Sequence, residues 1–81
     1  MITVIKRTNP PCPYCNQAIS LLKRRGIEYQ TVELGDVYET FQAQGYRSVP
    51  QCFEGTEITV ESRIGGYEEL KGYIENGKYG N

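Results

Sequence analysis

Two cysteines, Cys12 and Cys15, are separated by a proline and a tyrosine, a few residues after a short apolar run. Residues three apart lie on one side of a helical turn, so the two sulfurs can close a disulfide and reopen it. Pro13 favours a helix that begins here, because its φ is already helical and its missing N–H would have no intrahelical partner. The pattern predicts a redox-active pair at the amino end of a helix.

The two sulfurs are expected to play different roles. Cys12 would lie at the helix N-terminus, where unpaired backbone N–H groups and the positive end of the dipole favour the thiolate. Cys15, one turn further along, experiences less of that field and is placed to attack a mixed disulfide formed on Cys12. We therefore predict that Cys12 is the nucleophile and Cys15 the resolving thiol.

Zinc binding and a purely structural disulfide are the alternative uses of such a pair. The chain has three cysteines and no histidine, whereas a structural zinc site takes four such ligands, so no metal site is expected. A disulfide that closes so short a loop constrains the unfolded chain little and would stabilise the fold weakly. Both alternatives are disfavoured relative to redox chemistry. The third cysteine, Cys52, has no cationic neighbours in sequence and is predicted to be an inert buried thiol.

Length and charge limit the other functions. The 81 residues predict one domain, residues 1–81, and the formal net charge of −1 gives no bias toward nucleic acid or membranes. The opening apolar run is too short for a signal peptide or membrane span, so we expect a cytoplasmic monomer. In that reducing compartment a close cysteine pair favours catalysis. The glycine-rich tail, residues 77–81, is expected to be frayed.

The elements that must position the cysteines follow from the apolar periodicity. A buried strand is predicted over residues 2–7, a helix over 13–25 with Gly26 after its last turn, and a second strand over 27–34. A strand, helix and strand of these lengths form a right-handed βαβ unit. The first two strands should therefore be parallel.

The second half of the chain predicts a ββα unit behind a short helix. Asp36 is expected to cap a helix that runs to residue 44, with Val37, Phe41 and Tyr46 as inward contacts. A third strand over 51–53, a turn at 54–56, a fourth, antiparallel strand over 57–61 and a last helix over 67–75 follow. The prediction is an α/β fold with a four-stranded mixed sheet flanked by three helices.

Three separated motifs give this arrangement a specific resemblance. Cys12-Pro13-Tyr14-Cys15, Ser48-Val49-Pro50-Gln51 and Gly65-Gly66-Tyr67 occur in this order and resemble the motifs of glutaredoxins, which have a minimal thioredoxin fold. The resemblance covers nearly the whole chain. It implies a thiol-disulfide oxidoreductase that reduces protein disulfides and glutathione mixed disulfides, with glutathione as co-substrate and no tightly bound cofactor.

The resemblance also implies roles for individual residues. Pro50 matches the family's cis-proline and, with Pro13 and Tyr14, would support the active site, while Val49 would pair with an extended cysteinyl backbone. Gly66 lets a ligand approach, and the N–H groups of Tyr67 and Glu68 would receive the γ-glutamyl carboxylate of glutathione. Glu69 either pairs with the ligand's amine or is an ordinary first-turn acid. Tyr14 is expected to line the substrate groove. Five other tyrosines are expected in or beside the core, namely Tyr29, Tyr38, Tyr46, Tyr67 and Tyr73.

The glycyl carboxylate of glutathione needs a cation, and here the chain departs from the family pattern. Glutaredoxins usually carry Lys or Arg three residues before the first cysteine, where this chain has Asn9. Arg7 and Arg47 are the candidates, with Lys6 as a further possibility, since an Arg can bind a carboxylate bidentately.

Two other functions stay open from the sequence. Residues 42–50 resemble the glutaredoxin-like electron donors of ribonucleotide reductase, which are recharged by thioredoxin reductase but lack the Gly65-Gly66 pair. A scaffold that binds an iron–sulfur cluster through Cys12 and glutathione is the alternative of another class. Pro13 disfavours it, because cluster-binding relatives tend to have a small flexible residue at that position.

Overall fold

The computed structural model describes residues 1–77 and contains the predicted succession of strands and helices. In chain order they are β1 (Ile2–Lys6), α1 (Pro13–Arg24), β2 (Tyr29–Glu33), the 3-10 turn η1 (Leu34–Val37), α2 (Tyr38–Ala43), β3 (Gln51–Glu54), β4 (Arg63–Gly65) and α3 (Tyr67–Glu75). From residue 78 on, the tail predicted to be frayed lies outside the described residues. No helix in the described part of the chain is long and apolar enough to cross a bilayer.

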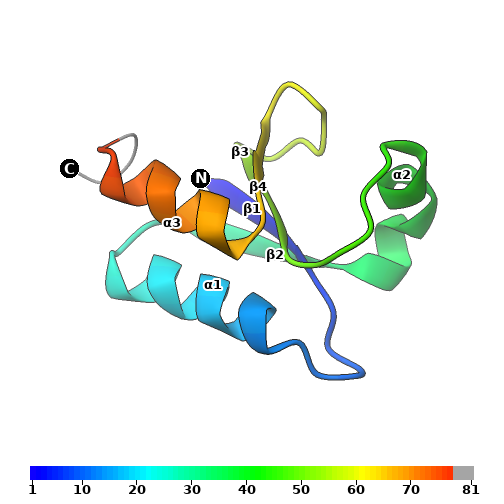
Figure 1. Ribbon diagram of the computed structural model, residues 1–81, viewed down its shortest axis with the longest axis horizontal. Helices are drawn as coiled ribbons and strands as arrows, with labels where there is room; N and C mark the ends of the chain where they lie inside the picture. Colours follow the sequence, from blue (N-terminus) through cyan, green and yellow to red (C-terminus); the bar gives the residue numbers. More distant parts are fainter. Residues whose placement is uncertain (78–81) are drawn as a thin grey trace.

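The four strands form one mixed sheet in the order β2-β1-β3-β4. β1 is parallel to β2 and antiparallel to β3, and β4 is antiparallel to β3. Figure 1 shows α1 and α3 together on one side of the sheet and α2 on the other. This is the predicted α/β arrangement, a βαβ unit followed by a ββα unit.

The core is divided between the two faces of the sheet because side chains alternate along each strand. One cluster lies under α1 and α3 and contains Ile2, Val4, Ala18, Leu21, Leu22, Ile27, Cys52, Leu70 and Ile74. The other contains Ile5, Phe41 and Phe53, with Tyr46, Val49 and Ile58 packed against it. Both ends of the cysteine helix are therefore held against the sheet by its apolar face.

The predicted fourth strand over residues 57–61 is wrong, because β4 begins only at Arg63. The Ser62 hydroxyl donates to the Glu57 carbonyl at 2.9 Å, and the Ser62 N–H donates to the Thr59 carbonyl at 3.2 Å. Ser and Thr side chains that bond the local backbone compete with a strand ladder. The alternating segment therefore forms a loop, and the strand that pairs with β3 is the short one before α3.

The predicted cap of the second helix is also wrong. Asp36 lies inside η1, and the residue that precedes α2 is Val37, with no hydrogen bond from its side chain. The tight turn ends one residue after Asp36, so its carboxylate is too early in the chain to reach the first N–H groups of α2. The inward contacts were predicted correctly, since Phe41 is buried and Val37 and Tyr46 pack beside it.

Candidate active site

Cys12 and Cys15 form a disulfide at the amino end of α1, with Cα atoms 5.2 Å apart. Cys12 is the N-cap residue, Pro13 is the first helical residue, and the first turn contains no acid. The Cys15 N–H donates to the Cys12 sulfur at 3.2 Å. Cys12 retains 4% of its surface and Cys15 none, so Cys12 is the more accessible residue of the pair.

The loop before β3 lies against this disulfide. The Val49 carbonyl oxygen is 3.8 Å from the Cys12 sulfur, and the Val49–Pro50 peptide bond is cis, as predicted. No group among residues 1–77 accepts a hydrogen bond from the Val49 N–H. The sequence motifs around Cys12 and Pro50, far apart in the chain, therefore meet at one place.

A cleft of about 290 Å³ opens beside the disulfide. Its lining contains every residue predicted to bind glutathione except the two arginines: Tyr14, Val49, Pro50, Gly66, Tyr67, Glu68 and Glu69, together with Ser48. Tyr14 is 58% exposed and its ring lies 6.0 Å from that of Tyr67. Tyr14 therefore lies at this cleft and outside the core, and its contact with a substrate stays a prediction.

The floor of this cleft includes the amino end of α3. The first N–H groups of a helix have no intrahelical acceptors, so those of Tyr67 and Glu68 are available to an anion. The Gly66 N–H donates to Glu69 Oε1 at 2.9 Å. Glu69 thus acts as a first-turn acid that caps the helix, and its predicted contact with a ligand amine stays a prediction.

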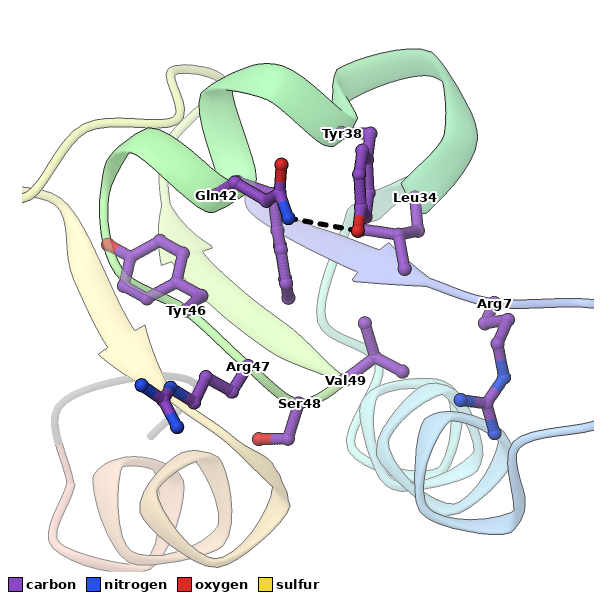
Figure 2. A pocket seen from close by; sticks show the side chains of 9 residues that line it. Arg7, Leu34, Tyr38, Gln42, Tyr46, Arg47, Ser48 and Val49 are labelled. Atoms are coloured by element: carbon purple, nitrogen blue, oxygen red, sulfur yellow. Dashed lines mark hydrogen bonds between the residues drawn. The ribbon is translucent and has the colours of Figure 1, made fainter.

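The two predicted arginines line a second cleft of about 300 Å³, and Figure 2 shows their side chains at its opposite ends. Arg7 donates to the carbonyls of Pro10, through Nε at 2.9 Å, and Pro11, through Nη2 at 3.1 Å. Arg47 is exposed. Arg7 therefore stabilises the loop that precedes Cys12, a role that was not predicted from the sequence.

Lys6, the other cation considered, lies 3.7 Å from a Glu33 carboxylate oxygen. A hydrogen bond from the Thr8 hydroxyl, helped by Lys6, holds the pKa of Glu33 below its usual value. Lys6 is thus paired at the β2 edge of the sheet, and Arg7 and Arg47 are the cations that line the clefts.

The second cleft also contains residues that the sequence did not single out. Tyr38 was expected in or beside the core, but it is 49% exposed and its hydroxyl accepts a hydrogen bond from Gln42 Nε2 at 3.0 Å. The two residues are four apart on one face of α2. That spacing was the available signal, and Figure 2 shows both side chains on this helix above Val49.

Cys52 is fully buried in the cluster under α1 and α3. Burial, with a smaller contribution from the charge of Glu69, raises the pKa of its thiol to about 12. A thiol that stays protonated and covered is neither a nucleophile nor a ligand. The predicted burial of Cys52 is confirmed, and its inertness stays a prediction.

The raised pKa of Cys52 predicts a loss of stability in alkali. In the unfolded chain this thiol ionises near its ordinary pKa of 9.0, whereas in the fold it stays neutral to about 12. Ionisation therefore stabilises only the unfolded state as pH rises from about 9 toward 12. Urea unfolding of the disulfide form between pH 8 and 10.5 should show a steeper decline for the wild type than for Cys52→Ala. Parallel declines would contradict this assignment.

Known proteins are similar to this chain in sequence. The family model described as Glutaredoxin matches residues 2–58. A glutaredoxin of Neisseria meningitidis serogroup A is 37% identical over 75 residues, which cover 86% of this chain and 82% of that protein.

Solved structures of glutaredoxins are also similar to this chain. A buckwheat glutaredoxin–glutathione complex has a TM-score of 0.72 and 31% identity, and the match covers 95% of this chain and 70% of that one. The glutaredoxin-like protein NrdH-redoxin from Escherichia coli has a TM-score of 0.66 over 84% of each chain. At 21% identity, the second comparison shows a common fold alone.

Proposed function

The chain belongs to the glutaredoxin family of thiol-disulfide oxidoreductases, and we propose that it reduces glutathione mixed disulfides and protein disulfides with glutathione as the reductant. The observation that carries this proposal is the cleft beside Cys12, which gathers residues from α1, the Val49 loop and the start of α3. The activity would belong to a reducing compartment such as the cytoplasm, whose glutathione pool can recharge the cysteines.

The first step is an attack by the Cys12 thiolate on the glutathionyl sulfur of a mixed disulfide. The S–S bond of the substrate breaks, and the protein thiolate leaves and takes a proton from solvent. A second glutathione thiolate then attacks the glutathionyl sulfur bound to Cys12, which releases oxidised glutathione and restores the Cys12 thiolate. The Cys15 N–H bond to the Cys12 sulfur and the helix dipole stabilise the anion and thereby improve it as a leaving group.

A protein disulfide uses the second cysteine as well. After Cys12 has formed a mixed disulfide with the substrate, Cys15 attacks the Cys12 sulfur and releases the reduced substrate. The product is the Cys12–Cys15 disulfide of the structure. Two glutathione molecules return it to the dithiol and leave as oxidised glutathione.

The two clefts suit the two ends of glutathione. The N–H groups of Tyr67 and Glu68 at the start of α3 would receive the γ-glutamyl carboxylate, with acids beside them for the amine. The cysteinyl backbone would lie along Val49, which lines both clefts, and the glycyl carboxylate would face Arg7 or Arg47 in the other. Arg7 already binds two loop carbonyls, so the exposed Arg47 is the better candidate.

A comparison of two reductants tests the proposal. Turnover of a mixed disulfide should proceed with glutathione, NADPH and glutathione reductase, and should stay near the enzyme-free rate with NADPH and thioredoxin reductase. The expectation follows from the proposed binding of glutathione in the two clefts, because glutathione would then reduce the cysteines directly and no contact with a reductase would be needed. The same assay with Cys12→Ser serves as the blank for both reductants.

The opposite result would favour the second candidate function, an electron donor of ribonucleotide reductase recharged by thioredoxin reductase. Its support is the resemblance of residues 42–50 to such donors, together with the fold shared with NrdH-redoxin. The Gly65-Gly66 pair before α3 favours glutathione.

A further inference from the structure

A buried glutamine connects β4 with the active-site loop. Gln51, the first residue of β3, is only 4% exposed. Its Nε2 donates to the Ser48 carbonyl at 3.0 Å, and its Oε1 accepts from Arg63 Nε at 2.9 Å. With a donor on one side and an acceptor on the other, the amide can take only one orientation. Gln51 is therefore a fixed link between Arg63 and Ser48.

Arg63 is itself held from two directions. The edge of its guanidinium donates to Gln51, and its face lies over the Tyr46 ring, with 5.1 Å from Cζ to the ring centroid. Tyr46 packs in turn against Phe41 and Phe53, with ring centroids 5.7 and 6.1 Å away. The link thus begins in the apolar cluster under α2 and ends at the active-site loop.

The hydrogen bond to Ser48 determines where the Val49 N–H points. The Ser48 carbonyl and the Val49 N–H belong to one planar peptide, which is trans. In a trans peptide these two groups point in opposite directions. Since Gln51 holds the carbonyl from the side of β3, the N–H is turned away from β3, where no acceptor among residues 1–77 meets it. The next carbonyl, that of Val49, lies 3.8 Å from the Cys12 sulfur.

We propose that Gln51 is a positioning residue that, anchored by Arg63, aims the Val49 N–H at the backbone of a cysteinyl disulfide substrate. Its effect is on specificity, because it favours disulfides whose sulfur belongs to a peptide over small disulfides without a backbone. The inference rests on the proposed function and deepens it, since it names the feature of the substrate that the loop recognises.

Gln51→Met tests this with a neutral side chain of similar length that cannot bond Ser48. Gln30→Met is the matched control, because Gln30 also donates its Nε2 within the sheet, to Thr3 Oγ1 at 2.9 Å, but lies on the far edge strand β2. Arg63→Lys, at an exposed position, removes the planar donor to Gln51 while it keeps the charge. Arg63→Lys therefore tests the same link if Gln51→Met prevents folding.

The measurement uses fully reduced protein, so it does not depend on the reductant that recharges the chain. The protein is mixed with oxidised glutathione or with bis(2-hydroxyethyl) disulfide, which has no backbone. In each reaction Cys12 thiolate displaces one thiolate, Cys15 displaces the second, and solvent supplies their protons. Rate constants for loss of protein thiols are compared, together with the pH profile of Cys12 alkylation by iodoacetamide.

In the wild type and in Gln30→Met, the rate constant should be higher for oxidised glutathione than for bis(2-hydroxyethyl) disulfide. In Gln51→Met the rate constant for oxidised glutathione should fall about tenfold, the loss expected for one misaligned hydrogen bond. The rate with the backbone-free disulfide and the alkylation profile should change less than about twofold. Arg63→Lys should show a smaller loss of the same preference.

Three outcomes would overturn the inference. If Gln51→Met matches Gln30→Met, or slows both disulfides equally, Gln51 does not aim the loop, and the proposed function stands. If the wild type itself shows no preference for oxidised glutathione, recognition of the backbone fails, and the proposed use of glutathione fails with it.

Discussion

Cys12→Ser should lower the turnover of every disulfide substrate at least about a thousandfold, whereas Cys15→Ser should keep the reduction of glutathione mixed disulfides. Cys12 is the N-cap of α1, receives the Cys15 N–H and is the only one of the pair with exposed surface. A serine hydroxyl there does not ionise near neutral pH, so the nucleophile is lost. The route that needs one cysteine should survive in Cys15→Ser, and the route through the Cys12–Cys15 disulfide should not.

Cys52→Ala is the control for this pair, because it removes the third thiol, which is fully buried in the core. It should leave turnover of both substrates unchanged. The measurements are steady-state reduction of a glutathionylated peptide and of a protein disulfide, each with glutathione and glutathione reductase. Equal losses in Cys12→Ser and Cys15→Ser on the glutathionylated peptide would show that the assigned roles are wrong.

Gly65→Ala should lower the free energy of unfolding by about 3 kcal/mol, a large share of the stability of so small a domain. Gly65 has a φ of +133°, which a side chain disfavours. A Cβ there would lie 2.6 Å from Glu69 Cβ and 2.7 Å from Glu69 Cγ. The start of α3 would have to move, and the bond from the Gly66 N–H to Glu69 would be lost with it.

Gly72→Ala is the matched control for Gly65→Ala. Gly72 lies inside α3 at an ordinary helical φ, and nothing comes within 4 Å of a Cβ built on it. This change should raise the free energy of unfolding by about 0.5–1 kcal/mol, because alanine favours the helix. Urea unfolding of the disulfide form measures both variants. A Gly65→Ala protein as stable as the wild type would mean that α3 can begin without this close approach.

The sequence alone was enough for the local features of this protein. Pro13 after Cys12, the apolar spacing that follows and Gly26 predicted α1 from its first residue to its end, and similar signals predicted α3 over 67–75. These features depend on residues three or four apart in the chain. The redox pair, the helix end on which it lies and the burial of Cys52 could therefore be predicted without the structure.

Only the tertiary structure decided which segments pair and which polar groups meet. Residues 57–61 alternate like a strand, yet β3 pairs with Arg63–Gly65, because Ser62 bonds back to Glu57 and Thr59. The sequence suggested Arg7 as a ligand cation, but the fold also engages it in the Cys12 loop.

The same limit applies to Gln51, whose partners are three residues before it and twelve after it. Its two hydrogen bonds exist only once β3, β4 and the Val49 loop are assembled. Local sequence determines which helix or turn forms because the interacting atoms are neighbours in the chain. The partner of a buried amide or an arginine is determined when distant segments pack together, and no short-range pattern specifies it.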